Sequence, residues 1–313
     1  MSMKTILFGN GLNLLNGYST WKDLLERIDD KDDDTKIPNI LQYEAEILPT
    51  PFKQKKVVTI EGEPVYFDKE PIIWSIGTET KLKTNIADEM KKYRSNEIYQ
   101  RIASMQDITH MMTTNYDDVM KQTLEGYGYK ETMHVKTENT YSIRRQIVLD
   151  RGGGSQKNIW NIHGEISVPQ TIMLGLHQYC GSVSRISDYL AGKYSFKKGK
   201  ETITIPKIQE RLREGVEKPS SWIDLFFVSD VYIMGFSLLY EEIDLWWVLT
   251  RRKRLIRQGN PISNNIFFCG KVSPGKRRLL NIMDVDVIEP DSKIDDDDFW
   301  GQYHSILDKI DGM

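Results

Sequence analysis

Cysteine is scarce in this sequence, and its scarcity excludes several kinds of site. The 313 residues include only two cysteines, Cys180 and Cys269. Two cysteines cannot supply the paired Cys-x-x-Cys motifs of a zinc ribbon, and a disulfide framework is typical of much shorter secreted chains. His177 and Cys180 have a spacing that suits a metal ligand pair, but no second pair completes a tetrahedral site. We therefore expect reduced thiols, a cytoplasmic protein and no bound metal.

Long hydrophobic runs are also missing. The apolar run at residues 1–8 is broken at once by Gly9 and Asn10, so it is too short for a signal peptide. No stretch approaches the length of a membrane span, and we expect no membrane contact. The formal net charge of -3 gives no general reason to expect a nucleic-acid ligand. The basic clusters at 251–254 and 276–278 are interpreted as solvated helix surface.

The hydrophobic pattern predicts an α/β protein. Short apolar runs, typical of buried strands, occur at residues 4–9, 107–113, 158–162, 231–234, 265–269 and 285–288. Helical spacing occurs at 21–28, 79–92, 95–105, 241–257 and 299–310, and a hairpin is predicted at 53–67. We predict a single Rossmann-like domain over residues 1–313, with a mostly parallel sheet flanked by helices. Insertions are expected at about 30–105 and 165–230, and a short helix at 299–310.

Polar or glycine residues follow four of the predicted strands. These clusters are GNGLN at 9–13, TTNYD at 113–117, IHG at 162–164 and GFS at 235–237. In an open α/β sheet, ligands bind in the crevice beyond the carboxyl ends of the strands. The four clusters therefore predict the rim of one pocket, which would contain an amide, a carboxylate and an imidazole.

Each cluster taken alone also has a purely structural interpretation. The first lacks the third glycine of a full dinucleotide fingerprint, because Leu14 stands there, so a tight turn explains it about as well as a phosphate or ribose contact. Asn115 and Asp117 alone are better explained as a turn residue and a helix N-cap. His163 could be a satisfied histidine at a strand end, although a His-Gly tip leaves the imidazole accessible, as a general base requires. The four clusters in this order are harder to explain structurally.

The order of these motifs resembles that of the sirtuin-like family, whose members carry a glycine-rich first loop, a Thr-x-Asn-x-Asp stretch, a His-Gly tip and a later Gly-x-Ser. The resemblance spans residues 6–288 apart from two insertions. Asn10 after the first glycine, Tyr116 in the Asn-x-Asp stretch and the absence of zinc cysteines are similar to the sirtuin-like NADase domains of prokaryotic anti-phage defence systems. The resemblance implies a sirtuin-like Rossmann fold without a zinc ribbon, and it does not extend to histone-type deacylases.

The resemblance also implies an activity, the cleavage of NAD+ to nicotinamide and ADP-ribose. Asn115 would bind the nicotinamide ribose or an ordered water, His163 would accept a proton from a ribose hydroxyl or that water, and Asp117 would lie by the nicotinamide amide or the developing cation. The first loop would hold the diphosphate on free backbone amides, and the Gly-x-Ser motif would bound the adenosine side. The residues expected to contact NAD are Gly9, Asn10, Gly11, Leu12, Asn13, Thr114, Gly235 and Ser237.

An NADase that is never switched off would kill its own cell, so we expect its activity to be gated. No sensor domain is recognisable after residue 288, and we therefore expect a homo-oligomer or a separate protein, by resemblance a HerA-type hexameric ATPase or a phage component. Two alternatives stay open: a non-catalytic module that senses NAD or ADP-ribose, and an abortive-infection protein of the AbiH type. The sequence does not distinguish hydrolysis from cyclisation or base exchange, because all three begin with the same bond cleavage.

Overall fold

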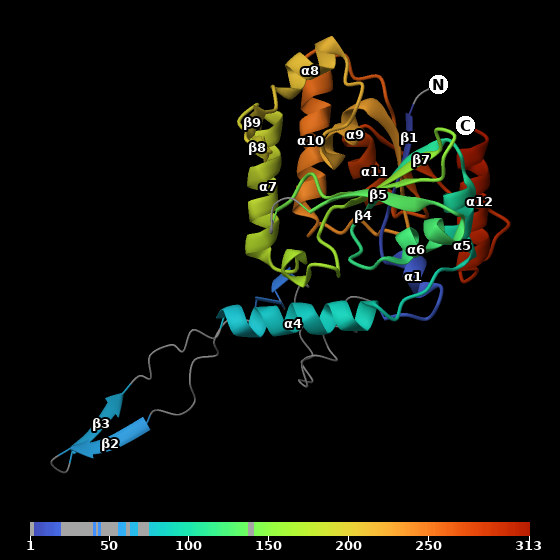
Figure 1. The fold of residues 1–313 in the computed structure, drawn as a ribbon. Coiled ribbons are helices and arrows are strands. Elements are labelled where there is room, and N and C mark those ends of the chain that lie inside the picture. Colours follow the sequence, from blue (N-terminus) through green and yellow to red (C-terminus); the bar gives the residue numbers. More distant parts are fainter. Residues whose placement is uncertain are drawn as a thin grey trace.

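The computed structural model describes residues 3–19, 40–41, 43–44, 56–60, 63–67, 75–136 and 141–313. Its centre is an eight-stranded sheet in the order β12-β11-β10-β1-β4-β7-β6-β5 (Figure 1). Neighbouring strands from β12 to β7 are parallel, whereas β6 and β5 are antiparallel. The strands are β1 (Met3–Phe8), β4 (Ile108–Thr113), β5 (Lys130–Val135), β6 (Gln146–Asp150), β7 (Gln156–Asn161), β10 (Ser229–Met234), β11 (Ile266–Cys269) and β12 (Val285–Ile288). The predicted fold class, a mostly parallel α/β sheet, is confirmed.

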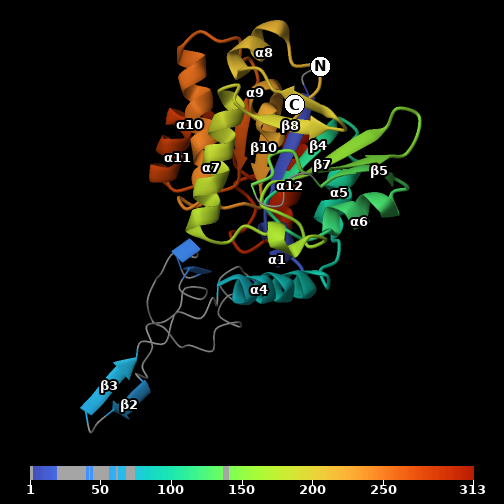
Figure 2. The same cartoon turned by 60° about the vertical axis from the view of Figure 1, so that its left-hand side comes forward.

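Helices cover both faces of this sheet, and Figure 2 shows α7, α10 and α11 on the opposite side from α5 and α6. On β1, Ile6 and Phe8 join one hydrophobic core while Leu7 joins the other, because successive side chains of a strand point to opposite faces. The helices are α1 (Gly11–Leu14), α4 (Ser75–Met90), α5 (Glu97–Ser104), α6 (Val119–Gly126), α7 (Leu176–Leu190), α8 (Ile208–Glu214), α9 (Trp222–Val228), α10 (Ile243–Arg257), α11 (Pro274–Ile282) and α12 (Phe299–Asp311), with a 3-10 turn η1 (Pro169–Thr171). Within the described ranges, every helix is too short or too polar to span a bilayer.

The six strands and four of the helices predicted from the sequence are present within a few residues of the expected bounds. Strands β5 and β6 and helix α11 are additions that the sequence did not predict. β5 lies at the edge of the sheet, where most of its side chains are exposed, so it carries no continuous apolar run. The helix expected at 21–28 lies outside the described residues.

The two expected insertions contain most of the remaining elements. A hairpin forms from β2 (Lys56–Ile60) and β3 (Glu63–Phe67), as predicted for residues 53–67. The second insertion holds η1, α7, α8 and α9, together with a hairpin of β8 (Ser195–Lys198) and β9 (Glu201–Thr204). The division into one domain with two insertions stays a prediction.

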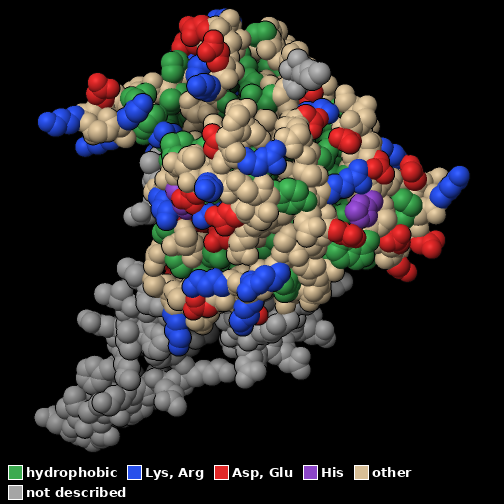
Figure 3. All heavy atoms as spheres, turned by 45° about the vertical axis from the view of Figure 1, so that its right-hand side comes forward, with side chains coloured by type: hydrophobic (Ala, Val, Ile, Leu, Met, Phe, Trp, Pro, Cys, Tyr) green, Lys and Arg blue, Asp and Glu red, His purple; other side chains and the backbone are tan. Residues whose placement is uncertain are grey.

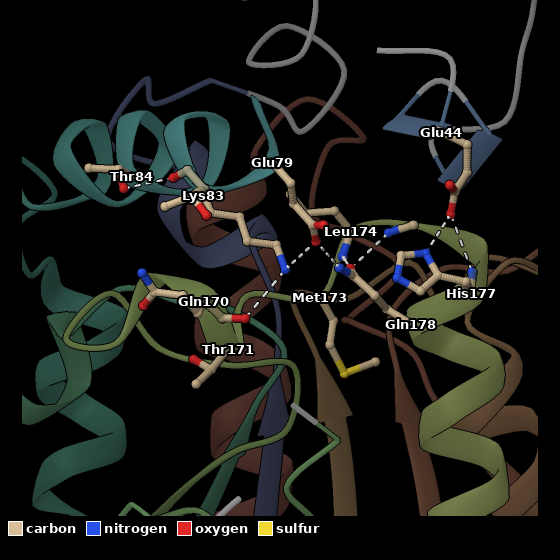
Figure 4. A network of polar contacts seen from close by, with 12 residues as sticks. Glu44, Glu79, Lys83, Thr84, Gln170, Thr171, Met173, Leu174, His177 and Gln178 are labelled. Carbon is tan, nitrogen blue, oxygen red and sulfur yellow. Dashed lines mark hydrogen bonds and ion pairs between the residues drawn. The ribbon is translucent and has the colours of Figure 1, made fainter. Parts of the chain in front are cut away.

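Helix α4 lies across the end of the sheet at which α1 begins, and a polar network holds it there (Figure 4). The buried ammonium of Lys83 lies 2.8 Å from Glu79 Oε1 and donates to the carbonyl of Gln170. Gln178, on α7, donates to the same Glu79 oxygen at 2.7 Å and accepts from the backbone N–H of Leu174. The network therefore joins α4 to the segment between β7 and α7, which contains the candidate residue His163.

Candidate functional site

A cavity of about 730 Å³ opens beyond the carboxyl ends of β1, β4, β7 and β10. These four strands are neighbours in the sheet, so the four sequence motifs that follow them meet at one place. Eight of the eleven expected site residues line the cavity: Asn10, Gly11, Thr114, Asn115, Asp117, His163, Gly235 and Ser237. Gly9, Leu12 and Asn13 are not among the lining residues.

The first loop is locked to the loop after β10. The backbone N–H of Gly11 donates to the carbonyl of Gly235 at 2.8 Å, and a Cβ atom on Gly11 would lie only 2.6 Å from that oxygen. Gly235 itself has a φ of +58°, which favours glycine. The N–H of Leu12 donates to the carbonyl of Gly9. The expectation of free amides for a diphosphate is therefore wrong for Gly11 and Leu12, whose N–H groups are already used within the protein.

Asn13 lies beneath the cavity and connects two of the candidate residues. Its Nδ2 donates to Asp117 Oδ2 at 2.8 Å, and its Oδ1 accepts from the hydroxyl of Tyr99, also at 2.8 Å. That hydroxyl in turn accepts a hydrogen bond from Asn115 Nδ2 at 3.4 Å. Asn13 and Tyr99 are fully or almost fully buried, so they support the cavity floor rather than face a ligand. The sequence interpretation missed Tyr99, because this residue is only one apolar position of helix α5.

Asp117 combines a structural role with an electrostatic one. Its Oδ1 accepts from the backbone N–H of Val119 at 3.0 Å, at the start of α6, as expected of a residue near a helix N-terminus. Burial raises the pKa of the carboxyl to about 6, although the hydrogen bonds from Asn13 and Val119 oppose the rise. At neutral pH most copies of Asp117 are therefore anionic while lying at a largely buried position on the cavity wall.

His163 is held more tightly than its position at a strand tip suggests. The side chain is only 2% exposed, and Nε2 lies 3.0 Å from Asp244 Oδ2. Nδ1 lies 4.0 Å from Glu242 Oε2, and the ring of Tyr179 packs edge-on at 5.2 Å between centroids. The expectation of an accessible imidazole is wrong, because residues of α7 and of the start of α10 pack against the ring, which faces the cavity.

Glu242 and Asp244 are functional candidates that the sequence interpretation missed. The sequence shows them only as acidic residues at the start of a helix, where the macrodipole favours them. Asp244 is completely buried, while the side chain of Glu242 is 17% exposed and lines the cavity. Burial raises the pKa of Glu242 to about 7. Burial lowers the pKa of His163, but the two carboxylates outweigh that effect and raise it overall.

The ligand atoms of His163, Glu242 and Asp244 all lie within 4.8 Å of one another, a spacing that would also suit a metal ion. His163 is already hydrogen-bonded to Asp244, and the expectation of no metal stays a prediction.

The far wall of the cavity comes from α12, through Phe299, Gln302, Tyr303 and Ile306. On the molecular face in Figure 3, acidic and basic side chains intermingle, and neither sign forms one broad patch.

Comparison with known proteins supports the sirtuin-like resemblance. A family model described as a SIR2-like domain matches residues 109–252. The matched segment runs from β4 into α10, so it contains Asn115, Asp117 and His163, and it also contains Glu242 and Asp244. SIR2-like domains bind NAD. No curated protein matches the chain.

Proposed function

We propose that this protein is an NAD+ glycohydrolase, which cleaves NAD+ to nicotinamide and ADP-ribose. The observation that carries the proposal is that one cavity gathers the amide of Asn115, the carboxylate of Asp117 and the imidazole of His163, all within the segment matched by the SIR2-like domain model. The cavity volume of about 730 Å³ lies in the range of small-molecule and cofactor sites.

The chemistry needs few groups, which agrees with the composition of the cavity. Nicotinamide leaves as a neutral molecule because its pyridinium nitrogen takes the bonding electron pair, so no general acid is required and the transition state resembles an oxocarbenium ion. The anionic carboxylate of Asp117 would stabilise the developing positive charge in a partly desolvated site. Asn115 would orient the ribose or the attacking water, and His163 would accept the proton.

The rest of the cavity would hold the remainder of NAD. Asn10 and Thr114 lie on the cavity wall, as do the interlocked glycines Gly11 and Gly235, which have no Cβ and so allow the two loops to pack closely against each other. Ser237 would bound the adenosine side. Gly9, Leu12 and Asn13 would act indirectly, by shaping this loop.

The test is to incubate the purified protein with NAD+ and to identify the products by chromatography and mass spectrometry. We expect nicotinamide and ADP-ribose from the wild type, and a loss of about 10²–10³ in rate for Asn115→Ala, the range found when one oriented hydrogen-bonding group is removed. The matched control is Asn281→Ala, because Asn281 is exposed and does not line the cavity. Binding of NAD+ without turnover would overturn the proposal and favour a sensing module. A cyclic product would replace hydrolysis with cyclisation.

We also propose that the enzyme works in the cytoplasm as the effector of an anti-phage abortive-infection system. A homo-oligomer or a second protein, by resemblance a HerA-type hexameric ATPase, would hold the activity in check. The support is the resemblance carried by the motifs, together with the damage that unchecked NAD+ cleavage would do. The same assay on fractions separated by size tests the gate, and a constitutively active lone monomer would contradict it.

A further inference from the structure

The start of α10 places one carboxylate on each side of His163. Asp244 Oδ2 lies 3.0 Å from Nε2, and Glu242 Oε2 lies 4.0 Å from Nδ1. The three side chains differ in their access to the outside: Asp244 is completely buried, His163 is 2% exposed, and Glu242 is 17% exposed and lines the cavity. The arrangement is therefore a row of three groups, of which Glu242 is the most exposed.

We propose that Asp244 is a positioning residue that keeps the proton of neutral His163 on Nε2, so that Nδ1 is the base, and that Glu242 is a catalytic residue that carries the substrate-derived proton from Nδ1 to solvent. This inference rests on the proposed NAD+ cleavage and assigns the proton path of that same site.

The surroundings of Asp244 fix its role as an acceptor. A carboxylate can only accept hydrogen bonds, so the ring nitrogen that faces it must carry the proton. Asp244 Oδ1 accepts from the backbone N–H of Leu245 at 2.8 Å, and Oδ2 also accepts from the hydroxyl of Ser182 at 3.4 Å. These contacts hold the carboxylate in place, and with it the orientation of the imidazole. The other nitrogen, Nδ1, is left with a free electron pair on the side of Glu242.

The surroundings of Glu242 suit a group that exchanges protons near neutral pH. Its pKa of about 7 follows from burial, which the charge of His163 opposes. The hydroxyl of Tyr179, on α7, donates to Oε2 at 3.4 Å, and the other described titratable groups near Glu242 are Asp244, Tyr116 and Glu241. A distance of 4.0 Å to Nδ1 is bridged by a small side-chain movement or by one water. Of the two carboxylates that flank His163, Glu242 is the one with an exposed side chain, so it can pass the proton on to solvent.

The step balances as follows. The bond between the ribose C1′ and the nicotinamide nitrogen breaks, and its electron pair stays on that nitrogen. The oxygen of a water molecule forms a new bond to C1′ and releases one proton to Nδ1 of His163. The proton then passes to the carboxylate of Glu242 and on to solvent. The products are nicotinamide, ADP-ribose and one proton.

The experiment compares Asp244→Asn and Glu242→Gln with Glu241→Gln, a neighbouring acid that does not line the cavity. Nitrogen-15 NMR of the His163 ring reports its tautomer and pKa without any turnover, and steady-state kinetics report kcat and KM against pH. For Asp244→Asn we expect loss of the Nε2–H tautomer and a fall in kcat on the order of 10⁴-fold, as when a buried aspartate that orients a catalytic histidine becomes an amide. KM should change little.

For Glu242→Gln we expect the pKa of His163 and the acid limb of kcat to move to lower pH, because a negative charge beside the ring is lost, and the plateau of kcat to fall about tenfold. Glu241→Gln should match the wild type. A wild-type tautomer and kcat in Asp244→Asn, or a profile of Glu242→Gln that coincides with that of Glu241→Gln, would overturn the inference. A wild type that never cleaves NAD+ would overturn the proposed function instead, while the NMR of Asp244→Asn would still decide whether Asp244 sets the tautomer.

Discussion

Two histidines are buried on neighbouring strands of the sheet, His110 on β4 and His163 just beyond the carboxyl end of β7, and their surroundings push their pKa values in opposite directions. Burial lowers the pKa of His110 to about 4. The indole N–H of Trp160 donates to His110 Nδ1 at 3.1 Å, a contact that needs an unprotonated nitrogen. His163 faces the carboxylates of Asp244 and Glu242 instead, and its pKa is raised.

The comparison teaches that burial alone does not decide what a histidine can do. Desolvation disfavours the charged ring at both positions, so the difference comes from the group that each ring faces. A donor keeps His110 neutral and makes it part of the core. Acceptors beside His163 raise its pKa instead, which makes the unprotonated ring a stronger base toward a proton of the substrate. Burial also lowers the pKa of Lys157, near the amino end of the sheet, to about 8.

The largest effect that tests this comparison is a loss of folding stability at acid pH, caused by the protonation of His110. The pKa of His110 is lower in the folded state than its ordinary value of 6.5, so the unfolded state binds more protons and stability falls as the pH drops from 6.5 to 4. A shift from 6.5 to about 4 corresponds to about 3 kcal/mol in the free energy of unfolding. His110→Asn keeps an acceptor for Trp160 and removes the titrating group. The substitution should therefore abolish this part of the loss of stability at low pH.

Urea unfolding at a series of pH values measures the effect. The difference in unfolding free energy between wild type and His110→Asn should be largest near pH 7 and shrink toward pH 4. If the two proteins lose stability in parallel over this range, His110 is not a neutral core histidine.

The parallel strands could be predicted from the sequence because they are buried on both faces and therefore appear as short apolar runs. Edge strand β5 could not, because its outward positions carry charged residues such as Lys130 and Glu131. Helix α11 (Pro274–Ile282) was not predicted as an element, because the sequence interpretation considered its basic residues 276–278 only as solvated surface.

The cavity residues divide in the same way. Asn115, Asp117 and His163 could be chosen because each directly follows a recognisable strand. Glu242 and Asp244 could not, because an acidic residue at a helix start has an ordinary local explanation, and only the packing of α10 against α7 brings both to the imidazole. Their importance depends on contacts across about 80 residues of sequence, which no local pattern encodes.

The next largest effect concerns how closely the loops at the carboxyl end are packed. A methyl group added at Gly11 would meet the backbone of Gly235 at 2.6–2.9 Å, and backbone atoms cannot move aside as a flexible side chain can. We expect Gly11→Ala to lower the free energy of unfolding by about 1–3 kcal/mol, the usual range for overpacking. Gly275→Ala is the control, because a Cβ there meets nothing within 4 Å. Equal unfolding midpoints in urea for the two variants would show that the two loops can separate freely.

The smallest expected effect is the pH dependence of stability that His163 causes, and it has the opposite sign to that of His110. The pKa of His163 is raised in the folded state, so its contribution to stability is fully present below the ordinary value of 6.5 and is lost as the pH rises through the folded pKa. His163→Asn should therefore be most destabilised relative to wild type at low pH, and the gap should close as the pH rises. We expect a smaller change than for His110→Asn, because desolvation and the two carboxylates act in opposite directions on this ring. The two variants are each other's control in the urea series. Slopes of the same sign for both would mean that Asp244 does not hold a proton on His163, and the distinction between a core histidine and a catalytic one would fail.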